Sequence, residues 1–177
     1  GLSAGNAQAA PILMRSLDGG AHWQDHTPAS AVAVSVRSIA VDATNPSRMA
    51  IACSGEWAGG ALWTSEDAGL NWSLRSNGLP HQPMLSVAFV GARLFVGGGS
   101  RLGQQNFGLH ASDDLGRHWY PLHRADWPSL VITDIAPSTA GADTLWIATD
   151  GAGVSRSDDG GRNWKHSLRG SASLSLR

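Results

Sequence analysis

Hydrophobic residues fall into short segments along the whole chain, and turn-forming residues separate these segments. Residues 37–41, 49–53 and 61–65, for example, are mostly apolar, with an Asn-Pro pair between the first two and glycines before the third. Short apolar runs bounded by turn residues predict β-strands. No stretch of about 11 or more residues repeats apolar positions with the period of a helix, so we expect an all-β protein.

The same order of strands recurs along the sequence. Residues 71–75 complete a first set of four, and residues 11–16 and 22–26 predict only half of such a unit near the N-terminus, because residues 1–10 are rich in Ala, Gly and Asn. Residues 171–177 alternate Ser and Leu and are expected to begin a first strand of a further unit. The other two sets are predicted at 85–90, 93–97, 108–112 and 118–122, and at 131–136, 144–149, 153–157 and 163–168.

One eight-residue pattern, Ser-x-Asp-x-Gly-x-x-Trp, occurs once in each unit. Its aspartates are 49, 47 and 45 residues apart, so the pattern marks a structural repeat that covers the chain as a single domain, with units at about 11–30, 36–76, 84–124 and 130–169. The four copies are Ser16, Asp18, Gly20 and Trp23; Ser65, Asp67, Gly69 and Trp72; Ser112, Asp114, Gly116 and Trp119; and Ser157, Asp159, Gly161 and Trp164.

These residue types fit a β-hairpin turn. A short carboxylate can accept hydrogen bonds from N–H groups of its own turn, the following Gly can adopt a positive φ, and the Ser hydroxyl can close the turn. The Trp can then cover the turn and lie against the neighbouring unit. We therefore assign the box residues a structural role; a calcium loop would need more oxygen ligands at closer spacing.

The pattern resembles the Asp-box, or BNR repeat, of sialidases, xyloglucan-cleaving glycoside hydrolases, sortilin-type receptors and photosystem II assembly factors. The resemblance extends to residues 36–46 and 60–65 of the second unit. It implies a β-propeller of four-stranded antiparallel blades, with about three and a half to four blades in this chain. It also implies an exported protein, periplasmic or extracellular.

Closed propellers generally contain about 4–8 blades. Three arrangements remain open: the chain is part of a larger propeller, two or more copies assemble into a ring, or residues 171–177 pair with residues 11–16 to close a ring of four blades.

Composition and charge narrow the choice of partners. Lys and Arg number 13 against 14 Asp and Glu, which leaves no basic excess for nucleic acid or an anionic membrane surface. No apolar run approaches the length of a membrane helix. The single cysteine, Cys53, cannot form an internal disulfide, and the 7 histidines show no metal-ligand spacing, so we expect neither metal nor cofactor.

The resemblance places ligand sites at the end of the sheets opposite the boxes, where the second strand of each unit connects to the third and where units are linked. Tryptophan and amide side chains there suit stacking on a sugar ring or holding a peptide. Each also has an ordinary structural interpretation as loop packing or a solvated charge. The binding candidates are Trp57, Arg101, Gln104, Asn106 and Trp127.

A glycosidase would need two carboxyl groups about 5–10 Å apart. Only Glu56, Asp126 and Asp150 lie on suitable loops, and the Arg-Ile-Pro segment, Tyr-Glu pair and arginine triad of sialidases are missing. The sequence therefore favours a non-catalytic module that binds a protein or carbohydrate, with part of a glycoside hydrolase as the alternative.

Overall fold

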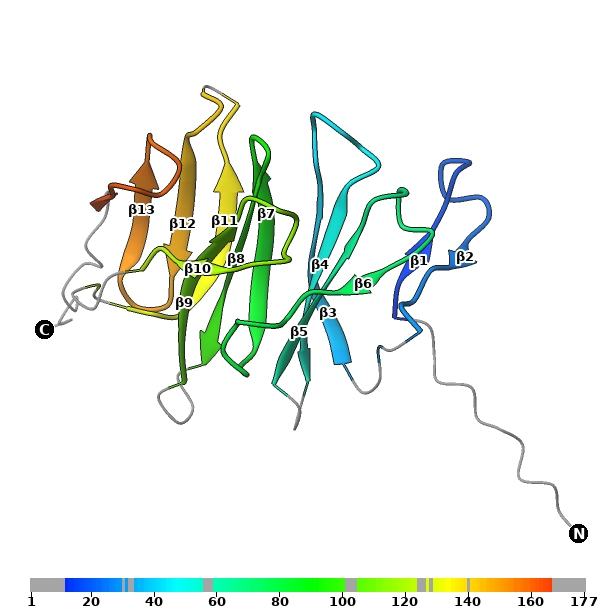
Figure 1. The fold of residues 1–177 in the computed structure, drawn as a ribbon, viewed down its shortest axis with the longest axis horizontal. Helices are drawn as coiled ribbons and strands as arrows, with labels where there is room; N and C mark the ends of the chain where they lie inside the picture. The colour runs from blue at the N-terminus through cyan, green and yellow to red at the C-terminus, as the bar shows by residue number, and fades with distance from the viewer. Residues whose placement is uncertain are drawn as a thin grey trace, which may run out of the picture.

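The chain folds into antiparallel β-sheets that stand side by side in a row (Figure 1). The computed structural model describes residues 12–29, 31, 34–55, 59–100, 105–123, 127, 129–139 and 141–166. These residues form three four-stranded sheets and one two-stranded sheet, the predicted all-β propeller architecture. Residues 1–10, for which no strand was predicted, and residues 171–177, which were expected to begin a further strand, lie outside the described residues.

Each four-stranded sheet follows the chain order of its strands. The two-stranded sheet contains β1 (Met14–Arg15) and β2 (Gln24–Asp25). The next contains β3 (Val34–Val41), β4 (Met49–Gly55), β5 (Gly60–Ser65) and β6 (Ser73–Leu74). The third contains β7 (Met84–Val90), β8 (Arg93–Ser100), β9 (Gln105–Ser112) and β10 (Tyr120–Pro121). The last contains β11 (Ile132–Pro137), β12 (Leu145–Thr149), β13 (Gly153–Ser157) and β14 (Lys165–His166).

The fourth strand of each sheet is shorter than the sequence predicted. Residues 71–75 were expected to form a strand, but β6 contains only Ser73–Leu74. The reason is local: the Asn71 N–H donates to the Asp67 carboxylate and therefore still belongs to the hairpin turn. The same correction applies to 22–26, 118–122 and 163–168, where β2, β10 and β14 are each two residues long among the described residues.

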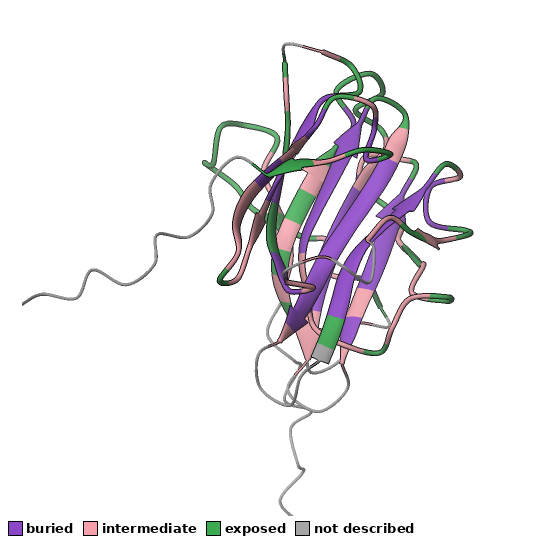
Figure 2. Cartoon of the chain, turned by 90° about the vertical axis from the view of Figure 1, so that its left-hand side faces the viewer, coloured by how far each residue is buried: buried purple, intermediate pink, exposed green. Residues whose placement is uncertain are grey.

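Side chains alternate between the two faces of each sheet, and those of the two middle sheets pack against a described neighbour on either side. In β4, Ala50 and Ala52 contact the β7–β10 sheet, whereas Ile51 and Cys53 point the other way, toward Leu13 and Trp72. A second core joins Phe95 and Leu109 to the β11–β14 sheet. Buried residues are concentrated in the strands, and exposed residues in the hairpins (Figure 2). Cys53 is fully buried in β4, within the apolar strand predicted at residues 49–53.

Neighbouring sheets contact each other through their first strands, β3 with β7 and β7 with β11. Each of these strands has a register shift. In β3 and β7 a serine follows the shift and bonds to the next sheet, whereas in β11 Asp134 stands at that position. The Ser38 Oγ accepts the Val87 N–H at 3.2 Å, and the Ser86 Oγ accepts the Ile135 N–H at 3.0 Å. A serine hydroxyl in the first strand thus joins neighbouring sheets at the β3–β7 and β7–β11 seams.

Arg93 provides a second tie across the last seam. Its Nη1 donates to the Gly160 carbonyl at 2.7 Å, in the hairpin of the neighbouring sheet. Its Nε donates to Asp113 at 2.8 Å and its Nη2 to the Tyr120 hydroxyl. This arginine holds the β7–β10 and β11–β14 sheets together by charge-assisted hydrogen bonds.

Candidate functional site

The four box hairpins are closed by the same set of hydrogen bonds. In the second box, the Ser65 Oγ donates to Asp67 Oδ1 at 2.8 Å and accepts the Gly69 N–H at 2.8 Å. Asp67 Oδ1 also accepts the Asn71 N–H at 2.8 Å. The other boxes repeat this set with Ser16, Asp18, Gly20 and His22, with Ser112, Asp114, Gly116 and His118, and with Ser157, Asp159, Gly161 and Asn163.

These bonds stabilise the ionised form of each box aspartate. The Asn71 backbone N–H is the main reason that the pKa of Asp67 falls to about 2, and the Asn71 side chain adds to it. The pKa of Asp159 falls to about 2 for the same reasons, through Asn163. A general acid needs a pKa near the working pH, so a carboxylate held this way is unsuited to proton transfer.

The box turn contains two successive residues with positive φ. Ala68 has a φ of 58° and Leu115 a φ of 57°, directly before Gly69 and Gly116. Such a conformation is unusual for residues other than glycine. The sequence pattern predicted it for the glycine only, because the preceding position varies between boxes.

The box tryptophans cover their own turns. A Cβ added to Gly116 would lie 3.1 Å from Cζ2 of Trp119, so the indole lies directly on the glycine. The Trp119 Nε1 donates across the seam to the Arg75 carbonyl at 2.7 Å, and the Trp164 Nε1 donates to Gly161 at 2.9 Å. The Trp72 Nε1 is buried without a hydrogen-bond partner.

The candidate binding residues were predicted at the opposite end of the sheets. There β4 ends and β5 begins, whereas the boxes close the other ends of β5, β9 and β13 (Figure 1). Of the candidates, Asn106 is exposed in β9, and Asp150 is half-buried in the turn between β12 and β13. Glu56, Trp57, Arg101, Gln104 and Asp126 lie outside the described residues, so their mutual geometry stays a prediction.

Trp127 lies in the seam between the last two sheets. Its ring meets that of the box residue Trp164 edge to face, with 5.4 Å between the ring centroids and 82° between the planes. It also packs against the core that includes Phe95 and Ile132. Trp127 therefore packs between the last two sheets.

His110 is a buried polar group that the sequence did not single out. It is 6% exposed and contacts the rings of Phe107 and His123, at centroid distances of 5.0 and 5.3 Å. Burial, helped by the nearby His123, lowers the pKa of His110 to about 4. The ring is thus neutral near pH 7.

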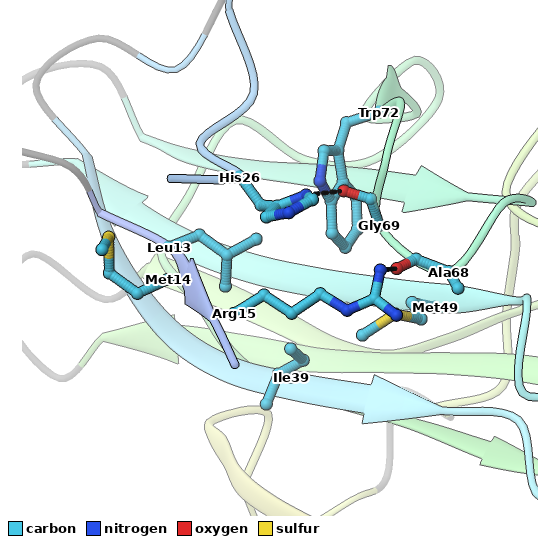
Figure 3. Close-up of a pocket in the computed structure, with 9 residues that line it drawn as sticks. All are labelled: Leu13, Met14, Arg15, His26, Ile39, Met49, Ala68, Gly69 and Trp72. Carbon is cyan, nitrogen blue, oxygen red and sulfur yellow. Dashed lines mark hydrogen bonds between the residues drawn. The ribbon is translucent and has the colours of Figure 1, made fainter. Parts of the chain in front are cut away.

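An apolar pocket opens between the β1–β2 sheet and the β3–β6 sheet (Figure 3). It encloses about 340 Å³, open solvent at its mouth included. Arg15 Nη1 donates to the Ala68 carbonyl at 2.6 Å, and His26 Nδ1 bonds to the Gly69 carbonyl at 2.7 Å, which ties the small sheet to the second box. The apolar part of the lining comes from Leu13, Met14, Ile39, Met49 and Trp72. The sequence predicted the half-unit but not this pocket.

Within the described part of the chain, no three His, Cys, Asp or Glu side chains gather as metal ligands would. The same residues contain no helix suited to crossing a membrane.

Comparisons with known proteins identify the fold. No family model matches the chain, and no curated protein matches it. Among solved structures, a GH74 enzyme from Niastella koreensis is 19% identical, with a TM-score of 0.54 over 74% of this chain and 22% of the other. YCF48 bound to the D1 peptide is 18% identical, with a TM-score of 0.54 over 75% of this chain and 40% of the other. The GH74 xyloglucanase from Xanthomonas campestris is 21% identical, with a TM-score of 0.52 over 76% and 24%.

This chain therefore spans well under half of each of these structures. At such identities the likeness shows the fold alone. Together with the four box hairpins, it identifies the chain as part of an Asp-box β-propeller fold.

Proposed function

We propose that this chain is a non-catalytic propeller module that recognises a protein or a glycan through the end of its sheets opposite the box hairpins. The proposal rests on the hydrogen bonds at the box end, which occupy the aspartate carboxylates. There the carboxylates of Asp18, Asp67, Asp114 and Asp159 bind the N–H groups of their own turns.

The sequence that connects the second strand to the third differs from sheet to sheet. Residues 56–59 contain Glu and Trp, residues 101–106 contain Arg, Gln and Asn, and residues 150–152 form a short turn with Asp150. Amides and a guanidinium can bind peptide groups or sugar hydroxyls, and a tryptophan can stack on a ring. A related fold with a bound peptide, YCF48 with D1 peptide, supports a protein ligand.

Binding assays on loop-end and box-end variants test this function. The wild-type chain is screened on a peptide array and a glycan array, and the best probe is titrated by calorimetry. We expect Trp57→Ala and Arg101→Ala each to weaken binding about tenfold or more, a loss of about 1.4 kcal/mol. Trp127 is left out because its substitution also disturbs the seam with Trp164.

The matched control is Leu17→Ala, at a box hairpin where the side chain is 76% exposed. It should leave affinity unchanged. If Leu17→Ala weakens binding as much as the loop-end variants do, the assignment of the two ends is wrong.

Polysaccharide hydrolysis is the second candidate function, and the likeness to the GH74 enzymes favours it. It requires two carboxyl groups about 5–10 Å apart, which only Glu56, Asp126 and Asp150 could provide at the loop end. Xyloglucan is incubated with the wild-type chain and with Glu56→Gln and Asp150→Asn. If the wild-type chain releases reducing sugar and either substitution abolishes that release, the chain is a hydrolase and the proposal of a non-catalytic module is wrong.

A further inference from the structure

The apolar pocket between the β1–β2 sheet and the β3–β6 sheet is open to solvent. Two of its lining residues are large apolar side chains that remain accessible: Ile39 is 51% exposed and Met14 is 40% exposed. Arg15 extends across the pocket from β1 toward the second box (Figure 3). An apolar cavity of about 150 Å³ is enough for a molecule the size of benzene. The pocket, at about 340 Å³ with the solvent at its mouth, therefore has room for a small organic ligand.

Arg15 occupies a position that the next two units fill with a short side chain. The residue directly before the box serine is Thr64 in the second unit and Ala111 in the third. The Thr64 hydroxyl donates to the Leu115 carbonyl of the following box at 3.4 Å. Arg15 makes the same bond to the Ala68 carbonyl, and both acceptor residues have a positive φ. A threonine is therefore enough to join the two sheets at this position, and the guanidinium is not needed for that bond.

The guanidinium of Arg15 has hydrogen-bonding capacity that the chain leaves unused. A guanidinium carries five N–H groups, and toward the described residues Arg15 uses one of them, on Nη1. The fourth unit also has an arginine before its box serine, but there Asp158 pairs with Arg156 at 2.6 Å. No carboxylate is among the described residues that line the pocket. A positive charge beside an apolar wall, without an acidic partner, favours an anion with an apolar body.

We propose that this pocket binds a small carboxylate with an apolar body of about six to eight carbon atoms. The carboxylate accepts charge-assisted hydrogen bonds from the remaining N–H groups of Arg15. The apolar body packs on Leu13, Ile39 and Trp72. None of the box aspartates lines the pocket, so the ligand leaves the hydrogen bonds of the hairpins intact. The site is separate from the loop end to which the binding of a protein or glycan is assigned.

Calorimetric titration of the full chain with hexanoate tests the site. Hexan-1-ol and hexylamine carry the same apolar chain without the negative charge and serve as matched ligands. We expect hexanoate to bind one site per chain and hexan-1-ol to bind at least about tenfold more weakly, because only the carboxylate pairs with the guanidinium. Hexylamine should not bind. The proposal is overturned if hexanoate gives no heat of binding at about 10 mM, or if either matched ligand binds as tightly.

Two variants test the lining residues. Arg15→Thr removes the guanidinium and keeps the hydroxyl that Thr64 uses in the second unit. It should weaken hexanoate binding at least about tenfold and leave the weak binding of hexan-1-ol unchanged. Ile39→Asp introduces a carboxylate into the lining and should abolish hexanoate binding. Wild-type affinity for hexanoate in either variant would contradict the assigned site.

The matched controls make the same changes of charge outside the pocket. Arg162→Thr removes a guanidinium from an exposed position of the fourth box. Leu70→Asp adds a carboxylate at a position that is 65% exposed. Both should bind hexanoate as the wild-type chain does. A loss of affinity in these controls equal to that in the pocket variants would show that net charge, and not the pocket, determines binding.

Methyl NMR of the methionines locates the ligand in the wild-type chain. The sequence contains 3 methionines, of which Met14 and Met49 line the pocket and Met84 is buried in the core between the next two sheets. Hexanoate should shift the signals of Met14 and Met49, assigned with Met14→Leu and Met49→Leu, and leave that of Met84 in place. Saturation with hexanoate without these two shifts, or with a larger shift at Met84, would place the ligand elsewhere and overturn the proposal.

Discussion

At the scale of single residues, the small serine of each box is central to its hairpin. Ser112 is fully buried, and its hydroxyl both accepts the Gly116 N–H and donates to Asp114. Ser112→Ala leaves that N–H unpaired, so we expect it to lower the free energy of unfolding by about 1–2 kcal/mol in urea titrations. Ser73→Ala, at an exposed position of β6, should have almost no effect. Equal losses in the two variants would contradict the role given to the box hydroxyl.

His110 should make stability depend on pH. Its pKa in the folded chain is about 4, below the ordinary value of 6.5, so the unfolded chain takes up the proton first. The stabilisation is complete above pH 6.5 and is lost as pH falls from 6.5 toward 4. We expect the melting temperature to fall across this window in the wild-type chain and to fall less in His110→Gln. Parallel profiles for the two chains would exclude His110 as the cause.

At the scale of the elements, the box tryptophans differ in how they join sheets. The Trp119 indole donates to Arg75 in the preceding sheet, whereas the Trp72 Nε1 has no hydrogen-bond partner. Phenylalanine keeps most of the packing and removes the donor. Trp119→Phe should therefore cost about 1 kcal/mol more unfolding free energy than Trp72→Phe, measured by urea denaturation. A larger loss at position 72 would show that the seam bond contributes little.

Gly97 allows two sheets to approach closely. A Cβ at this position would lie 2.6 Å from Cγ2 of Ile132 in the next sheet. Gly97→Ala should destabilise the chain by about 1–3 kcal/mol through overpacking, seen as a lower melting temperature. Ala148 occupies the same register position in the last sheet, where no described sheet follows. Ala148→Val should be tolerated better, and the reverse order would refute the packing argument.

At the scale of the whole molecule, the sequence predicted what is encoded locally. The spacing of the boxes predicted the number and order of the sheets. This was possible because the residues that close each hairpin lie within the hairpin itself, as Ser65 and Asp67 do in the second box. The seams depend on which strands meet, and no local pattern contains that information. The Ser38 bond to Val87, the contact of Trp127 with Trp164 and the pocket beside Ile39 therefore emerged only from the structure.

The division between a structural box end and a binding loop end is tested most directly by carboxyl-carbon NMR titration of the aspartates. Asp18, Asp67 and Asp159 should titrate with pKa values of about 2, against an ordinary value of 3.8, and the pKa of Asp114 should also lie below that value. Box carboxyl groups that titrate at or above 3.8 would contradict the hydrogen bonds assigned to the box aspartates. The box end would then again be a candidate for catalysis or ligand binding.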